Sequence, residues 1–268
     1  YTITEADAEG FELTSKTGDT GTINTTLSEA KFTNTREVGD LEVSKTVVSD
    51  AAADANVEFT FTVTLSDTSI SKTYGDMTFA EGVATVTLKG GETATATGLP
   101  TGITYTITEA NATGFQLTSK TGDTGTISTT KSEAKFTNTR EVGDLELSKV
   151  LVSDAAADAD VEFTFTVTLS DKTISKTYGD MAFTNGVATV TLKGGEKATA
   201  TGLPTGITYT ITEANAPGFQ LTGQTGDEGS ITTEKSTAAF TNTREVGDLE
   251  LSKVLVSDAA ADANVEFT

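Results

Sequence analysis

Lysine, glutamate and asparagine recur at fixed positions in this sequence, and these three residue types together can form a covalent bond. Lys45, Lys149 and Lys253 follow one another at intervals of 104 residues. The neutral amine of lysine is a nucleophile, and the side-chain amide of asparagine contains an electrophilic carbon. A neighbouring carboxyl group can transfer the protons that such an attack requires. The residue types therefore permit a Lys–Asn amide bond, formed with release of ammonia.

The alternation of apolar and polar residues predicts where these side chains point. Residues two apart lie on the same face of a strand. In the run 145–151, Lys149 shares its face with three leucines, and in 207–213, Glu213 shares its face with Ile, Tyr and Ile. Asn242 shares its face with Ala238 and Phe240. We therefore expect all three polar side chains to face the core. The same positions in the preceding copy are Lys45, Glu109 and Asn138.

Two simpler interpretations of this pattern stay open at the level of sequence. The lysine and glutamate form a buried ion pair whose hydrogen-bonding needs the asparagine completes, or the three residues lie at strand ends and reach solvent. The chemical interpretation rests on burial, which disfavours the charged form of an amine and favours the protonated form of a carboxyl group. Holding the amine beside the amide in a folded core would supply the effective molarity that the reaction needs.

Composition excludes several classes of site. The 268 residues include no Cys, His or Trp, and the formal net charge is −21. Disulfides, thiolate metal sites and a catalytic triad built on histidine are therefore impossible. Strong acidity argues against nucleic-acid partners and anionic membrane surfaces. No apolar run is long enough to span a bilayer, so we expect no membrane insertion. We expect no metal and no cofactor. The strand-like opening YTITE suggests an interior piece of a longer protein.

The elements that must position these residues are β-strands. Apolar and polar residues alternate with period two through most of the chain, and glycines mark the turns. A repeat of 104 residues, identical at 85 positions between 37–140 and 141–244, has the size of a whole domain. We predict an all-β protein of tandem Ig-like antiparallel β-sandwich domains arranged end to end. The complete repeats are 37–140 and 141–244, while 1–36 and 245–268 belong to truncated repeats. A connector of only a few residues predicts a stiff rod.

The segment LPTG at 99–102 and 203–206 invites comparison with a cell-wall sorting signal. It has one residue fewer than such a signal and sits in front of a predicted strand. We predict a turn, with Pro at its second position.

The three-part pattern resembles the isopeptide-linked Ig-like domains of Gram-positive surface proteins, the pilin isopeptide-linkage domain and the collagen-adhesin B-type domain. The features that carry the resemblance are LELSK, GLPTGITYTITE and FTN, in that order. The resemblance implies amide bonds Lys45–Asn138 and Lys149–Asn242, assisted by Glu109 and Glu213. It also implies that Glu5 and Asn34 belong to a triad whose lysine is outside this chain, and that Lys253 begins a triad without partners here.

These observations predict a structural stalk or pilus-shaft segment on a Gram-positive cell surface. Its partners would be neighbouring repeats and other subunits of a surface fibre, and its only chemistry would be single-turnover bond formation. One alternative is a ligand-binding adhesin repeat. Another is an array stiffened by calcium, with carboxylate oxygens as ligands. Candidate calcium ligands are Asp144 with Glu141 or Glu146 at the junction, and Asp154, Asp158 and Asp160 in the acidic tract.

Overall fold

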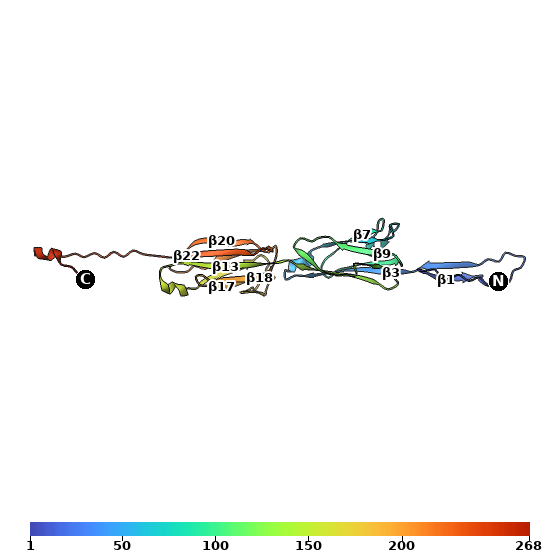
Figure 1. Cartoon of the computed structure of the whole chain (residues 1–268), viewed down its shortest axis with the longest axis horizontal. Helices are drawn as coiled ribbons and strands as arrows, with labels where there is room; N and C mark the ends of the chain where they lie inside the picture. Colours follow the sequence, from blue (N-terminus) through green and yellow to red (C-terminus); the bar gives the residue numbers. More distant parts are fainter.

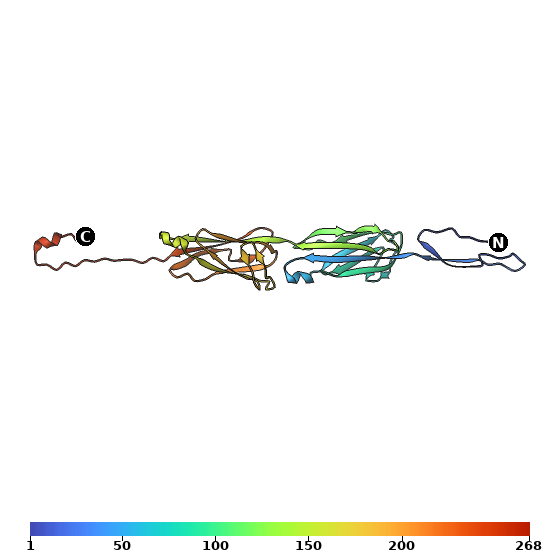
Figure 2. The same ribbon diagram turned by 90° about the horizontal axis from the view of Figure 1, so that it is seen from below.

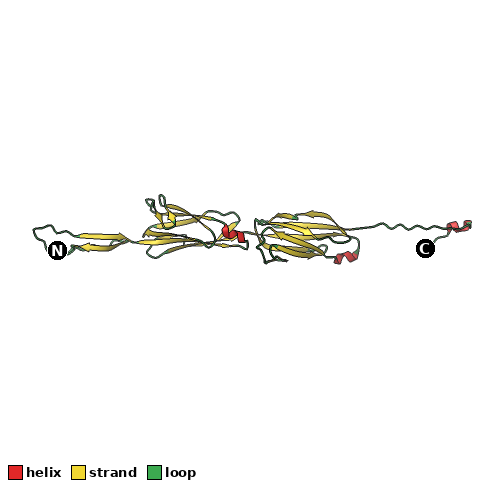
Figure 3. Ribbon diagram, turned by 180° about the vertical axis from the view of Figure 1, so that it is seen from behind, coloured by secondary structure: helices red, strands yellow, loops and turns green.

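The computed structural model describes residues 1–268, which form an elongated chain of β-structure. Two β-sandwiches lie in line, with a small hairpin at the N-terminal end and an extended segment at the C-terminal end (Figures 1 and 2). Strands dominate, and the helices are three single 3-10 turns (Figure 3). The prediction of tandem all-β sandwiches is confirmed. None of the helices is long and apolar enough to cross a membrane.

The hairpin consists of β1 (Phe11–Thr17) and β2 (Lys31–Arg36). The first sandwich contains β3 (Val38–Val48), η1 (Ala52–Asn56), β4 (Phe59–Leu65), β5 (Thr73–Tyr74), β6 (Met77–Thr78), β7 (Val83–Leu88), β8 (Thr93–Pro100), β9 (Thr104–Glu109), β10 (Phe115–Thr121), β11 (Thr124–Thr126) and β12 (Ser132–Arg140).

The second sandwich repeats this order with β13 (Val142–Val152), η2 (Ala156–Asp160), β14 (Phe163–Leu169), β15 (Thr177–Tyr178), β16 (Met181–Ala182), β17 (Val187–Leu192), β18 (Lys197–Pro204), β19 (Thr208–Glu213), β20 (Phe219–Thr225), β21 (Glu228–Ser230) and β22 (Ser236–Arg244). A last 3-10 turn, η3 (Ala260–Asn264), lies in the C-terminal segment.

Each sandwich packs two four-stranded sheets. In the second sandwich their strand orders are β18-β13-β22-β20 and β17-β14-β19-β21, and the first sandwich has the equivalent orders. The inward positions of the strands carry Leu, Val, Ile, Phe and Ala, while Thr dominates the outward positions of β14 and β19, as period-two alternation dictates. The two sheets meet through edge-to-face aromatic pairs such as Phe165–Phe240, with ring centroids 5.2 Å apart.

The first and last strands of each sandwich pair in parallel, which the sequence did not predict. β13 pairs with β22 and β3 with β12, whereas every other pair in the sheets is antiparallel. Because the two strands run in the same direction, the chain enters a sandwich at one end and leaves it at the other. This parallel pair turns a tandem repeat into a rod.

The LPTG segment departs in detail from its prediction. Leu203 and Pro204 end the strand β18, where Pro204 lies opposite Val142, and the turn itself is Thr205–Gly206. β18 is an edge strand, and a proline without an N–H group is tolerated at such a strand end. Pro therefore precedes the turn and does not occupy its second position.

Candidate functional site

Lys149 lies in the core of the second sandwich. It is the eighth residue of β13, its side chain points between the two sheets, and the residue is 1 % exposed. The ammonium nitrogen lies 4.0 Å from the ring centroid of Phe163. A cation over an aromatic face recovers part of the hydration that burial removes, but it leaves the hydrogen-bonding capacity of the amine to be met by other groups.

Glu213 meets the amine from the opposite sheet. It is the last residue of β19, which pairs with β14 in a register that places Glu213 opposite Phe165. Its side chain is 2 % exposed, and Lys149 Nζ donates a hydrogen bond of 2.9 Å to Glu213 Oε1. The contact therefore crosses the core from one sheet to the other.

Asn242 approaches the same amine from the neighbouring strand. In the parallel register of β13 and β22, Lys149 pairs with Phe240, and Asn242 follows two residues later on the same face. Asn242 is 2 % exposed, and the distance from Lys149 Nζ to Asn242 Oδ1 is 2.5 Å. Since a carbonyl bond is about 1.23 Å long, the amide carbon lies within about 3.7 Å of the amine nitrogen. That is the range in which a positioned nucleophile can attack.

The first sandwich places its own three residues in the same way. Lys45 is 1 % exposed and Asn138 is 3 % exposed, and Lys45 Nζ donates a hydrogen bond of 2.7 Å to Glu109 Oε1. Lys45 Nζ also lies 3.9 Å from the ring centroid of Phe59. Here the amine does not form a hydrogen bond to the asparagine, whose Oδ1 has no hydrogen-bond partner.

Each buried triad contains polar atoms without a partner. Glu109 Oε2 and Glu213 Oε2 are buried without a hydrogen bond, and so is Asn138 Oδ1. An unpaired buried polar atom costs about 1–3 kcal/mol. A protonated carboxyl oxygen and an amide carbonyl oxygen complement each other as donor and acceptor. The unpaired atoms are thus those between which a catalytic proton would pass.

Burial changes the acidity of both lysines. Desolvation lowers the pKa of Lys149 from its ordinary value of 10.5, against the opposing effect of the hydrogen bond and charge of Glu213. The pKa of Lys45 is lowered for the same reason, with Glu109 opposing. A larger fraction of each amine is therefore neutral at a given pH than for a lysine in water.

The residues of the incomplete triads lie in the terminal segments. Asn34 Nδ2 donates a hydrogen bond of 2.8 Å to Glu5 Oε1, so the hairpin alone brings this glutamate and asparagine together, at an exposed site. Lys253 lies in the extended C-terminal segment, where its Nζ is 4.2 Å from the ring centroid of Phe267. Neither site contains a complete Lys–Glu–Asn set.

The acidic residues considered as calcium ligands do not lie together as a metal site. The structure contains no cluster of three or more Asp and Glu residues arranged to hold a metal. Asp144 accepts a hydrogen bond from the backbone of Gly202, and Asp158 accepts one from Ser153. Glu146 binds Lys197 and Lys235, and their hydrogen bonds lower the pKa of Glu146 to about 2.

Sequence reasoning missed a set of charged residues at the junction of the two sandwiches. Arg140 Nη2 donates to the backbone oxygen of Thr205, and Arg140 Nη1 lies 3.4 Å from Asp54 Oδ1. Asp50 Oδ2 accepts hydrogen bonds from Lys176 and Tyr178. The repeat itself carried a signal, because each of these residues recurs 104 positions away. Without the docked ends on view, that recurrence could not be separated from the general similarity of the copies.

Comparisons with known proteins point to surface fibres. The chain is 36 % identical over 115 residues to the pilus tip adhesin Cpa of Streptococcus pyogenes, a match that covers 38 % of this chain and 17 % of the adhesin. The chain thus spans less than a fifth of the length of that relative. This match bears out the resemblance to Gram-positive pilus proteins.

Solved structures with overlapping folds include two major pilins of Streptococcus pyogenes. The T-13 pilin is 17 % identical with a TM-score of 0.46, and the match covers 77 % of this chain and 97 % of the pilin. The T3.2 pilin is 18 % identical with a TM-score of 0.47, and the match covers 78 % of this chain and 99 % of the pilin.

A family profile matches the chain twice in tandem, at residues 39–140 and 143–244. The two matches correspond to the two sandwiches and together cover more than half of the chain. The chain therefore belongs to the family described as "Domain of unknown function (DUF7601)".

Proposed function

We propose that this chain is a force-bearing segment of a Gram-positive surface stalk or pilus shaft, in which self-formed amide bonds join Lys45 to Asn138 and Lys149 to Asn242. The observation that carries the proposal is the contact of a fully buried lysine amine with both a buried glutamate and the carbonyl oxygen of a buried asparagine. The repeat units would be 37–140 and 141–244, with 1–36 and 245–268 as parts of neighbouring copies.

The reaction balances without a cofactor. The neutral amine of Lys149 attacks Asn242 Cγ, a C–N bond forms, and negative charge develops on Oδ1, where the Glu213 carboxyl group supplies a proton. Glu213 then carries a proton from the attacking nitrogen to Nδ2, the C–Nδ2 bond breaks, and ammonia leaves. The glutamate ends in its starting state. Folding supplies the proximity, and the apolar surroundings, which exclude water, favour the neutral amine.

The bond would join the two strands through which tension passes. Lys149 and Asn242 are 93 residues apart in sequence and lie on the parallel first and last strands of the sandwich. A covalent link between these strands would let tension bypass the chain between them. By analogy with a disulfide, closing a loop of this length would stabilise the sandwich by about 4–5 kcal/mol. The site is also free of the buried charge that an uncross-linked pair retains.

Location and partners follow from the relatives. The curated relative is by name a pilus adhesin, and the solved neighbours are by name major pilins. We therefore assign this chain to the extracellular surface, with neighbouring repeats and other fibre subunits as its partners. Its activity would be a single bond-forming turnover per sandwich and no catalysis on external substrates.

Intact mass spectrometry of the denatured chain tests the cross-links. We expect the chain to be lighter than its sequence by two molecules of ammonia, one for each sandwich. Glu213→Gln should restore one ammonia to the mass, because it removes the proton carrier of one site and leaves Lys45, Glu109 and Asn138 intact. Glu109→Gln should do the same for the other site.

Lys253 provides the matched control, since this chain contains no asparagine for it to join. Lys253→Arg should alter the mass only by the substitution itself. A parent chain whose mass equals the sum of its residues would refute the cross-links, whatever the behaviour of the variants.

A ligand-binding repeat is the second candidate, because the curated relative carries the word adhesin in its name. Saturable binding of host matrix proteins to the folded chain would favour this candidate. Absence of binding together with the predicted mass would leave the stalk function.

A further inference from the structure

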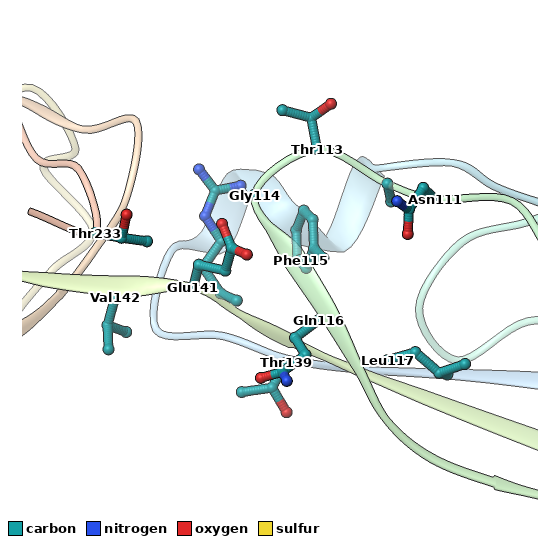
Figure 4. A pocket seen from close by; sticks show the side chains of 12 residues that line it. Asn111, Thr113, Gly114, Phe115, Gln116, Leu117, Thr139, Glu141, Val142 and Thr233 are labelled. Carbon is teal, nitrogen blue, oxygen red and sulfur yellow. The ribbon is translucent and has the colours of Figure 1, made fainter.

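The junction between the two sandwiches is made by more than a covalent connection. β12 ends at Arg140 and β13 begins at Val142, so Glu141 alone separates them. Glu141 donates its backbone N–H to Gly114 O of the first sandwich at 2.9 Å, and its carbonyl oxygen accepts from Thr205 N of the second, also at 2.9 Å. Figure 4 shows Glu141 and Val142 crossing between Phe115 on one side and Thr233 on the other.

Arg140 forms a second attachment beside this crossing. Its guanidinium carbon lies 4.9 Å from the ring centroid of Phe115, and Asp54 of the same sandwich holds the group from another side. The free edge of the guanidinium donates to Thr205 O in the second sandwich. A methyl group added to Gly206 would come within 2.8 Å of Arg140 Nη2, so this close approach requires glycine.

A third attachment lies away from the crossing strand. Asp50, in the loop after β3, accepts a hydrogen bond of 2.8 Å from Lys176 Nζ and one of 3.0 Å from the Tyr178 hydroxyl of the second sandwich. The next residue, Ala51, is 8 % exposed because it packs into the hydrophobic core of the second sandwich. A contact outside the connecting strand opposes rotation of one sandwich about that strand.

The two sandwiches supply an internal comparison. Ala155 corresponds to Ala51 but is exposed, since no sandwich follows it. The Arg140 side chain is 17 % exposed, whereas the corresponding Arg244 side chain, with the same Asp and Phe partners in its own sandwich, is 44 % exposed. At the other end of the repeat, Tyr178 is 4 % exposed, while the corresponding Tyr74, with no preceding sandwich, is more exposed.

The Arg contact occurs a second time in the chain. Arg36, at the end of the hairpin strand β2, donates to Thr101 O of the first sandwich, and Glu37 accepts from Thr101 N at 3.0 Å. Two independent junctions thus use the same donor and acceptors. The pattern belongs to the repeat and not to one pair of neighbours.

We infer that the two ends of each sandwich are complementary halves of a docking surface whose partner is another copy of the same repeat. The leading half contains the positions of Lys176, Tyr178 and Thr205. The trailing half contains those of Asp50, Ala51 and Arg140. Docking fixes the bend and twist between copies, so every junction in an array has the same geometry. In a chain of net charge −21, a lysine facing an aspartate across the junction also selects the end-to-end orientation against general repulsion.

Pulsed electron resonance between two spin labels tests this inference on the full chain. The chain has no cysteine, so Thr85→Cys and Thr189→Cys place labels only on exposed positions of β7 and β17. We expect a narrow distance distribution in the parent. Asp50→Lys, which opposes two cations, should at least double its width, and Arg140→Ala should broaden it as well. Asp50→Lys combined with Lys176→Asp should narrow it again.

The matched controls are the same substitutions at equivalent positions without a neighbour. Asp154→Lys, Lys72→Asp and Arg244→Ala should leave the width unchanged, which separates docking from effects within a sandwich. A distribution unaffected by Asp50→Lys would overturn the inference, as would equal broadening by Asp154→Lys. The inference does not rest on the cross-links, and the intact mass of the same samples reports on those separately.

Discussion

Lys149 shows what a single buried residue imposes on this protein. A lysine amine has three hydrogen-bond donors and, when charged, a large cost of desolvation. Here the core offers it one carboxylate, one amide oxygen and an aromatic face, each from a different strand. Conversion of the amine into an amide would remove the charge and leave a single N–H donor. The chemistry and the stability of the core therefore favour the same product.

Removal of the asparagine should expose the cost of the free amine as a pH dependence. In Asn242→Ala, Lys149 remains a titrating amine whose folded-state pKa is lowered by burial below its ordinary 10.5. Between these two values the unfolded chain binds more protons than the folded chain, so the free energy of unfolding should rise as pH increases toward 10.5. Urea unfolding of the second sandwich at a series of alkaline pH values measures this rise.

The double variant Lys149→Met with Asn242→Ala is the reference for that experiment. It lacks the amine, so its stability should not show the added rise, and all other alkaline titrations cancel in the comparison. Equal pH profiles for the two variants would mean that Lys149 keeps its ordinary pKa in the fold.

At the level of elements, the parallel pair β13–β22 brings the lysine and asparagine together. Its register sets Lys149 against Phe240 and Asn242 two positions beyond, on the same inward face. The start of β13 is held where the backbone of the loop after β21 crosses it. A methyl group added to Gly143 would lie 1.7 Å from Thr232 O, so only glycine fits. The glycine thus lets the loop close over the first strand without shifting the register.

Gly143→Ala should therefore destabilise the second sandwich. Overpacking of a well-packed site costs about 1–3 kcal/mol, and a backbone oxygen cannot move aside as a flexible side chain would. We expect a lower urea midpoint for the second sandwich, measured in the Asn242→Ala background so that unfolding is not blocked by the cross-link.

Gly247→Ala is the control, because Gly247 is the same residue of the next copy and has no heavy atom within 4 Å of an added methyl group. It should leave the midpoint where it was. If the two substitutions behave alike, the close approach at Gly143 does not constrain the fold.

On the scale of the whole molecule, the repeat forms a rod in which the chain enters and leaves each sandwich at opposite ends (Figure 1). Tension along the rod shears β3 against β12 and β13 against β22, the strands that carry the proposed bonds. Outside those bonds the tension passes through the junction segment 139–147, which docking contacts alone support.

Single-molecule stretching should separate these two parts. The parent chain should lengthen only at its junction and terminal segments, because the loops closed by the amide bonds cannot extend. Asn138→Ala combined with Asn242→Ala should add two lengthening events of about 300 Å each, since 93 residues extend by about 3.3 Å apiece. Full-length extension of the parent at the same force would contradict a cross-linked shaft.

The sequence alone was sufficient for the properties that depend on periodicity. Alternation with period two fixes which face of a strand is apolar, so the inward positions of Lys149, Glu213 and Asn242 follow from their neighbours in the chain. A repeat of 104 residues likewise determines that the molecule is an array of similar units. These are local or translational regularities, and they need no knowledge of how distant strands meet.

The tertiary structure decided what depends on contacts between distant strands. Neither the parallel pairing of β13 and β22 nor the reach of Lys149 across the core to Glu213 can be derived from alternation, because alternation gives a face without a partner or a direction. The docking of Asp50 on Tyr178 depends on which loops meet at the ends of two sandwiches. Strand pairing and end-to-end packing are long-range choices, made by the whole core and not by any segment alone.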